Sequence, residues 1–303
     1  MRIVLLLLLA AFIVVIAALP AVRSVEREPV TDEVRMQAPG FFVHLAHGSV
    51  HVETTGPADG APVVLIHGLS IPSYVWDPTF EALGEAGFRA IRYDMYGGGY
   101  SDRPDVVYDE QLFRGQVIDL LDSLEIESAH LMGLSMGGAV AASVAAQHPE
   151  RVRRVVLIAP FNTPAGIGLL ESRLVGPWFH RVIFVPRLAG IIEDAFDDDI
   201  RPPRWRERYR EQMRYHGFSD ALLSTLRHFI ATDPMPAYRA LGDQEREVLV
   251  IWGKDDEVVR FEQHERLVEA TRAQLIALEG TGHAPHIERP EIVEAAVNRF
   301  LTE

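Results

Sequence analysis

The stretch Gly133-Leu134-Ser135-Met136-Gly137-Gly138 lies where a short apolar run ends and an Ala-rich run, Met136–Gln147, begins. A serine at such a junction occupies a strained turn, and Gly133 and Gly137, two places to either side, let neighbouring backbone pass without Cβ clashes. The amino terminus of the following helix also brings partial positive charge close to the serine. The sequence therefore predicts that Ser135 is a nucleophile presented between a strand and a helix.

Segments of strand and helix character alternate on both sides of this stretch, beginning with a hairpin around His47-Gly48. A continuous apolar run such as Pro62–Ile66 is typical of a strand buried on both faces of a parallel sheet. The alternation predicts the α/β class, with a mostly parallel, twisted sheet flanked by helices. The expected strands are Phe41–Ala46, Ser49–Thr55, Pro62–Ile66, Phe88–Tyr93, Ala129–Met132, Val155–Ile158, Val248–Trp252 and Gln274–Leu278, and the expected helices are Val75–Ala86, Asp109–Leu124, Met136–Gln147, Phe261–Thr271 and Pro290–Leu301.

The stretch between Ala159 and Arg246 interrupts this alternation. It is rich in Arg, Trp, Phe and Asp, contains segments of helix length and shows no convincing strand. A structureless loop of this length is improbable inside a compact domain. We therefore expect one domain over residues 41–303, with a helical insertion at about residues 161–246 that lies over the sheet.

The composition excludes several classes of function. The chain has 303 residues, a formal net charge of -14 and no cysteine. An acidic chain has no general attraction to nucleic-acid phosphate, so we expect no nucleic-acid partner. Without cysteine there are no disulfides, no zinc-thiolate or iron–sulfur sites and no thiol nucleophile.

The amino terminus begins with an unbroken apolar run, Ile3–Leu19, which would span roughly 26 Å as a helix. The run lacks the polar stripe of a helix packed on a globular core. We interpret residues 1–22 as a transmembrane anchor or a cleaved signal peptide, and residues 23–40 as a polar linker. The domain would then be anchored to a membrane through this helix, or exported to the periplasm or secreted if the segment is cleaved.

Serine is a poor nucleophile by itself, so a base and an acid must come from elsewhere in the chain. Among the 12 histidines, His283 is the best placed, because it lies in a loop after a strand, where the carboxyl edge of a parallel sheet presents side chains. His286 is the alternative. The loop after the strand Val248–Trp252 contains Asp256, which is our choice for the carboxylate that orients the imidazole, with Asp255 next.

The negative charge that develops on a carbonyl oxygen needs hydrogen-bond donors. The stretch His67-Gly68-Leu69-Ser70 follows a strand directly, so the amide of Leu69 is placed to donate beside the amide of Met136, and the two would form an oxyanion hole. Gly68 keeps that approach free of a side chain. We interpret His67 as a hydrogen-bonded structural histidine.

Two further patterns are given other interpretations. His44, His47 and His51 cluster in the sequence, but strand alternation places the first two on opposite faces and no acidic residue stands at ligand spacing, so we assign no metal site. The loop around Gly97-Gly98-Gly99 lacks the Lys-Ser/Thr ending of a phosphate-binding loop. We expect it to serve as a turn and a packing element.

Taken in order, these motifs resemble those of the α/β-hydrolase superfamily, in particular its esterases and lipases. The resemblance runs from about Phe41 to the end of the chain. It implies the α/β-hydrolase fold with a helical cap, a catalytic triad of Ser135, Asp256 and His283, and no cofactor. One departure is Gly98, where many relatives carry a bulkier polar residue. The matching landmarks are His67-Gly68, the loop from Tyr93-Asp94 to Arg103-Pro104, Gly133-Leu134-Ser135-Met136-Gly137-Gly138, Gly253-Lys254-Asp255-Asp256 and Gly282-His283.

The function expected from these residues is hydrolysis of a small-molecule carboxylic ester through an acyl-enzyme. Lipid-like acyl esters are favoured because the domain is expected to lie near a membrane and because the insertion is rich in apolar side chains. An alternative is hydrolysis of a carbon–carbon bond in ring-cleavage diketones, or cofactor-free perhydrolysis, since such enzymes share the Ser-Met-Gly-Gly stretch. A non-enzymatic alternative is a membrane-tethered ligand-binding protein. The residues expected to line the pocket are Leu169, Leu170, Trp178, Phe179, Ile183, Phe184, Leu188, Ile191, Ile192 and Phe196.

Overall fold

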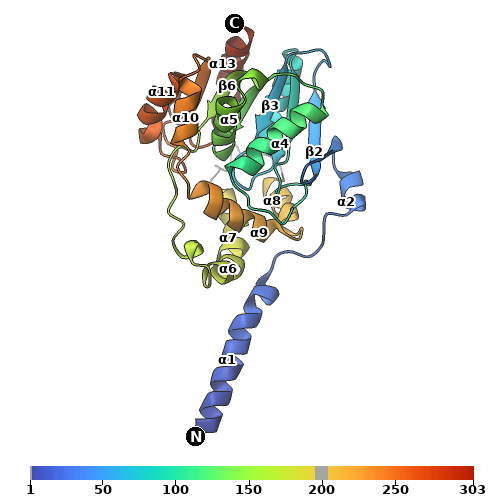
Figure 1. Ribbon diagram of the computed structural model, residues 1–303, viewed down its shortest axis with the longest axis vertical. Helices are drawn as coiled ribbons and strands as arrows, with labels where there is room; N and C mark the ends of the chain where they lie inside the picture. Colours follow the sequence, from blue (N-terminus) through green and yellow to red (C-terminus); the bar gives the residue numbers. More distant parts are fainter. Residues whose placement is uncertain (1, 195–203) are drawn as a thin grey trace.

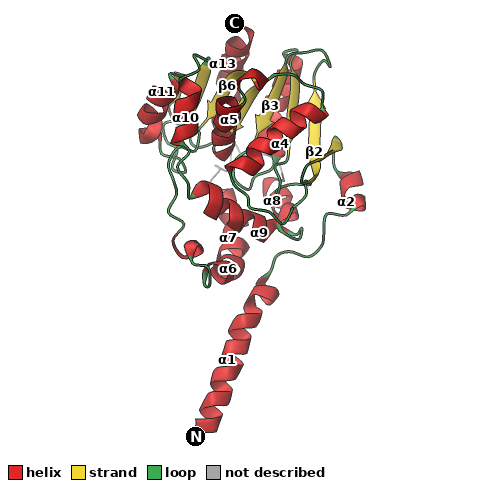
Figure 2. Ribbon diagram, in the orientation of Figure 1, coloured by secondary structure: helices red, strands yellow, loops and turns green. Residues whose placement is uncertain are grey.

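Strands and helices alternate along the chain, and Figure 1 shows how they are layered. The computed structural model describes residues 2–194 and 204–303. In Figure 2 the strands lie side by side with helices on both sides of them, and a further group of helices lies below their lower ends. The first helix extends away from the rest of the molecule (Figure 1).

One sheet of eight strands carries the fold, in the order β1-β2-β4-β3-β5-β6-β7-β8. β1 pairs antiparallel with β2, and β2 with β4, whereas the remaining pairings are parallel. The predicted fold class is therefore confirmed. The central strands are continuous aliphatic runs because helices cover both faces of the sheet. The strands are β1 (Phe41–Leu45), β2 (Gly48–Thr55), β3 (Pro62–Ile66), β4 (Arg89–Tyr93), β5 (Ala129–Leu134), β6 (Val152–Ile158), β7 (Val248–Gly253) and β8 (Gln274–Leu278).

Helices form a layer on each face of the sheet. α4 (Glu110–Ser123), α5 (Met136–Gln147) and α10 (Met235–Gly242) lie in front of it in Figure 1, and α11 (His264–Thr271) packs against α10. On the other face, α3 (Asp77–Glu85) and α13 (Pro290–Thr302) pack against each other, with the short α12 (Pro285–Glu288) beside them. We call the sheet and these two layers the body.

The chain between β6 and α10 forms the helical layer at the carboxyl ends of the parallel strands, which we call the cap. The sequence placed the end of this insertion at about residue 246, but α10 belongs to the body. The backbone of Gly242 lies so close to α11 that a Cβ there would be 2.0 Å from the Ala270 carbonyl oxygen. The cap comprises a 3₁₀ turn Gly168–Glu171, α6 (Gly176–Phe179), the π-helical η4 (His180–Phe184), α7 (Val185–Asp194), α8 (Trp205–Met213), α9 (Phe218–Thr225) and the π-helical η5 (Leu226–Ile230).

The amino-terminal segment begins with α1 (Arg2–Arg23), for which the sequence predicted an anchor or a signal peptide. No helix within the described residues combines the length and the apolar character needed to cross a membrane. The carboxyl-terminal part of α1 contacts η4 of the cap, and the indole nitrogen of Trp178 donates to the Ile16 carbonyl at 2.8 Å.

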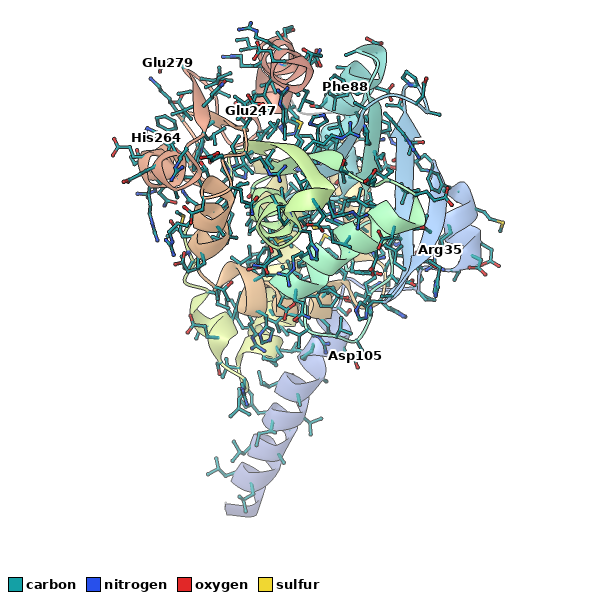
Figure 3. The ribbon with its side chains drawn as sticks, turned by 45° about the horizontal axis from the view of Figure 1, so that its top comes forward. Arg35, Phe88, Asp105, Glu247, His264 and Glu279 are labelled. Carbon is teal, nitrogen blue, oxygen red and sulfur yellow. The ribbon has the colours of Figure 1, made fainter. Side chains whose placement is uncertain are left out.

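Residues 24–39, which we call the strap, are bonded to the cap and not free as a polar linker would be. The amides of Arg27 and Glu28 donate to the Arg214 carbonyl at 2.6 and 3.2 Å, and the His216 amide donates to the Glu28 carbonyl at 2.8 Å. The strap continues into α2 (Asp32–Gln37), where Arg35, labelled in Figure 3, forms an ion pair with Asp102. Nothing in the sequence indicates this docking, because its backbone bonds depend on the position of the cap.

Candidate active site

Ser135 occupies the turn between β5 and α5. Its φ of 52° and ψ of -116° lie outside the regions that side-chain-bearing residues normally adopt. The strained turn is held by main-chain bonds: the Ser135 amide donates to the Ile158 carbonyl at 2.9 Å, and the Ser135 carbonyl accepts from the amides of Gly138 and Phe161 at 2.9 and 3.0 Å.

Glycine is required on both sides of this turn. A Cβ on Gly133 would lie 2.3 Å from the Gly137 carbonyl oxygen, and a Cβ on Gly137 would lie 2.2 Å from the Ile66 carbonyl oxygen. Both distances are far below van der Waals contact, so the side-chain-free positions expected from the sequence match a physical need of the turn.

His283 lies in the loop after β8 and is bonded to Asp256 in the loop after β7. Its Nδ1 is 2.8 Å from Asp256 Oδ2. Asp256 is only 4% exposed, and it also accepts bonds from the amides of Val258 and Val259 and from the indole of Trp252, at 2.8, 2.9 and 3.1 Å. Because an ionised carboxylate only accepts, the network assigns the proton to Nδ1 and leaves a lone pair on Nε2.

Glu288 supports the same loop, and the sequence reasoning missed it. Its carboxylate accepts from the amide of Gly282 at 2.6 Å and from the amide of Ala284 at 3.0 Å, on either side of His283. The signal in the sequence is weak, because an acidic residue near a short helix has many ordinary uses. The alternative acid, Asp255, is exposed.

His286, the alternative base, is enclosed in the body. Its Nε2 is 3.1 Å from the Val75 carbonyl oxygen, and its ring lies 4.7 Å from that of Trp76. Burial lowers the pKa of His286 to about 3. This histidine therefore packs the interface between α12 and the turn before α3.

The loop after β3 lies directly beside Ser135. An ideal Cβ on Gly68 would be 3.4 Å from the Cβ of Ser135, and Leu69 borders the same cavity as Ser135. Met136 is the first residue of α5, so its amide has no acceptor within the helix. The backbone groups expected to bind an oxyanion thus come from two loops that meet at the serine.

His67 joins this loop to the one after β4. Its Nδ1 donates to the Gly68 carbonyl at 2.8 Å, and its Nε2 accepts from the Met95 amide at 2.9 Å. An Nε2 that accepts an amide hydrogen bond carries no proton, and burial also lowers the pKa of His67. These bonds describe a structural histidine.

Ser135 and His283 border one cavity of about 430 Å³. The cap covers it with two aliphatic and aromatic stripes at helical i, i+4, i+8 spacing, one on η4 and α7 and one on α9 and η5. Both π-helical segments contribute to these stripes, and π-helical turns often occur at functional sites. The stripes are Phe184, Leu188 and Ile192, and Leu222, Leu226 and Ile230.

The other cap residues expected in the pocket have different positions. Leu169 and Ile191 are exposed, Leu170 is buried, and Trp178 contacts α1. Phe196 lies outside the described residues. The cavity rim carries Glu257 and Arg260, both exposed. Phe179 and Ile183 are partly buried elsewhere in the cap.

The Gly-rich loop after β4 closes around Asp94. A Cβ on Gly99 would lie 2.0 Å from an Asp94 carboxylate oxygen, and that carboxylate accepts from the amides of Ser73 and Tyr100 at 2.9 Å. Asp94 also pairs with His51 Nδ1 at 2.9 Å. Burial alone would raise the pKa of Asp94, but the charge and hydrogen bond of His51 outweigh it and lower the pKa. The loop therefore packs around a buried ion pair.

Among the described residues, no group of three or more His, Asp or Glu side chains is arranged to hold a metal ion. His51 is used in the ion pair with Asp94, and its Nε2 lies 2.6 Å from the Pro39 carbonyl oxygen.

The chain is similar in sequence to a known protein family and to several hydrolases. Residues 63–296 match the alpha/beta hydrolase family. A 2-hydroxymuconate semialdehyde hydrolase from Pseudomonas sp. (strain CF600) is 32% identical over 254 residues, which cover 80% of this chain and 88% of that protein. Carboxylesterase YbfK from Bacillus subtilis (strain 168) is 25% identical over 283 residues, 88% of either chain.

A solved structure with a similar fold is that of an enol-lactonase from Burkholderia xenovorans LB400. It superposes with a TM-score of 0.74 at 28% identity and covers 87% of this chain and 100% of that one. The family match runs from β3 through the cap and into α13.

Proposed function

The chain belongs to the alpha/beta hydrolase family, and from that premise we propose that it hydrolyses carboxylic esters through a covalent acyl-enzyme. The observation that carries this proposal is that Ser135 and His283 border the same largely apolar cavity of about 430 Å³. A concave apolar site with a few convergent polar groups is the usual form of a small-molecule pocket. A neutral ester with an apolar acyl or alcohol group suits it, and lipid-like esters are included.

In the proposed mechanism, Ser135 Oγ adds to the ester carbonyl as His283 Nε2 takes its proton. Asp256 holds the other ring nitrogen and stabilises the imidazolium. The amides of Leu69 and Met136 donate to the oxyanion, which collapses and expels the alcohol with the proton from His283. Water then attacks the acyl-enzyme in the same way, with His283 again accepting and returning the proton, and the acid is released from Ser135.

The charge of the cavity favours a neutral substrate over an anionic one. Among the described lining residues, Arg260 is the one permanent cation, and both it and the acidic lining residue Glu257 are exposed. A substrate carboxylate buried in this cavity would lose its hydration without a buried partner, which is unfavourable.

The second candidate is hydrolysis of a carbon–carbon bond in a dienoic keto acid. It is supported by the 32% identity to the 2-hydroxymuconate semialdehyde hydrolase, whereas the carboxylesterase and the enol-lactonase support ester cleavage. Both candidates use the same serine, so the substrate and not the triad distinguishes them.

The test is a substrate panel combined with active-site labelling. We expect p-nitrophenyl esters of graded chain length to be turned over at least tenfold more efficiently than 2-hydroxymuconate semialdehyde, measured as kcat/KM. The reverse order would establish the carbon–carbon candidate instead. A fluorophosphonate should label the wild type and Ser128→Ala, whose serine lies just before β5, at the opposite end of that strand from Ser135. It should not label Ser135→Ala. An unlabelled wild type without turnover would support a pure binding protein.

A further inference from the structure

A second strained turn, beside the first, has no place in the mechanism so far. Ser70 has a φ of 61°, and the amide of Ile71 donates to the Leu69 carbonyl at 2.9 Å. This closes a three-residue turn around Ser70, and a turn of this hand is rare and strained for a residue with a side chain. The strain lies directly after Leu69, whose amide is an oxyanion donor in the proposed function.

The cap helix α8 holds this turn with side chains. The hydroxyl of Tyr209 donates to Ser70 Oγ at 2.8 Å, and Gln212 Nε2 donates to the Ser70 carbonyl at 2.5 Å. Tyr209 and Gln212 stand three residues apart, so they share one face of the helix. They are 0% and 2% exposed. Two buried polar side chains therefore direct their hydrogen bonds at one strained residue.

Gln212 also reaches the Gly-rich loop. Its Oε1 accepts from the Gly99 amide at 3.0 Å. At the neighbouring Gly98, an added Cβ would meet nothing closer than 3.5 Å and would lie 3.8 Å from Gln212 Oε1. There is thus room for a Cβ at the position where the sequence departs from many relatives, and the cap supplies Gln212 beside it.

The cap helix α8 is held from both inside and outside the part of the chain that matches the family, residues 63–296. The strap bonds to the Arg214 carbonyl, one residue after the end of α8. At the other side of the helix, Arg208 pairs with Asp77 at 2.5 Å. The strap, the cap helix and the turn at Ser70 thus form one connected set of contacts.

We propose that Tyr209 and Gln212 are positioning residues for the oxyanion hole. By holding the strained turn at Ser70, they keep the Leu69 amide directed at the reacting carbonyl, so that the seating of the cap controls oxyanion binding. This inference rests on the proposed role of Leu69 in ester hydrolysis. It predicts that loss of these hydrogen bonds destabilises the transition state more than the bound ester, because the oxyanion forms only as the reaction proceeds.

The test compares Tyr209→Phe, Ser70→Ala and the double variant, assayed with a p-nitrophenyl ester. We expect each single variant to lower kcat roughly 10- to 100-fold with KM changed by less than about threefold, the size of effect produced by small misplacements of catalytic groups. The double variant should be no worse than either single variant, because both substitutions remove the same hydrogen bond, the one between Tyr209 and Ser70. Gln212→Leu should give a loss of the same kind.

Tyr108→Phe is the matched control. Tyr108 is also buried, and its hydroxyl donates to the Pro104 carbonyl at 3.0 Å, away from the cavity. The kcat of Tyr108→Phe should equal that of the wild type. Wild-type kcat in Tyr209→Phe, additive losses in the double variant, or an equal loss in Tyr108→Phe would each overturn the inference while leaving ester hydrolysis intact. A wild type without Ser135-dependent turnover would overturn the proposed function, and this inference with it.

Discussion

Two turns meet at the cavity, one around Ser135 and one around Ser70, and both hold a serine at positive φ, 52° and 61°. They are supported differently. The turn at Ser135 is bonded to main-chain groups at the end of β6 and just beyond it. The turn at Ser70 is bonded to the side chains of Tyr209 and Gln212 on the cap. The body thus places the candidate nucleophile, whereas the cap steadies the candidate oxyanion loop.

The largest effect should come from the turn that the body supports. Ser135→Ala should reduce ester turnover by roughly a millionfold, because the change removes the attacking oxygen and with it the acyl-enzyme. The measurement is the rate of p-nitrophenyl ester hydrolysis with enzyme in large excess. The control is Ser70→Ala at the other turn, where the loss should stay near a hundredfold or below. Turnover that survives in Ser135→Ala would place the nucleophile elsewhere.

The next effect tests how rigidly each region fixes its backbone. Gly137→Ala should lower the free energy of unfolding by more than about 3 kcal/mol or prevent folding, because a Cβ there has no space beside β3. Gly98→Ala, in the loop that faces the cap, should change it by less than about 1 kcal/mol. Urea unfolding followed by fluorescence measures both. Equal effects at the two glycines would contradict the difference in packing inferred for them.

The smallest effect compares one buried histidine of the body with one of the cap. Burial lowers the pKa of His286 to about 3 and that of His180 to about 4, against roughly 6.5 in an unfolded chain. Below about pH 6.5 the unfolded state binds protons that the folded state does not. The free energy of unfolding therefore decreases as the pH is lowered. At pH 5 each histidine should account for about 2 kcal/mol of this loss.

Urea unfolding at pH 7, 5 and 4 measures the difference between the two histidines. His286→Gln and His180→Gln should each reduce the loss of stability between pH 7 and pH 5. Between pH 5 and pH 4 the contribution of His180 should grow less than that of His286, because the folded state begins to protonate His180 at a higher pH. Variants with the same acid sensitivity as the wild type would show that these histidines are not held neutral by burial.

Most of the body was predictable because its signals are local. The strand runs, the strand-to-helix turn at Ser135 and the loops that carry Asp256 and His283 each depend on residues that are close in sequence. The roles of Glu288, Tyr209 and Gln212 were not predictable, since each bonds to a backbone group whose position depends on packing. The end of the cap was also misplaced, because α10 has the same amphipathic pattern whether it covers the cavity or the sheet.

By itself, the sequence determined the α/β class, the order of the strands and helices along the chain, and the close backbone approaches around Ser135 that only glycine permits. Hydrophobic periodicity and glycine stereochemistry act over a few residues, so they can be read without coordinates. Tertiary structure alone decided that the strap docks on the cap and that α8 reaches the turn at Ser70. Those contacts join parts of the chain that are far apart in sequence, and their formation depends on burial and hydrogen bonding in the packed molecule.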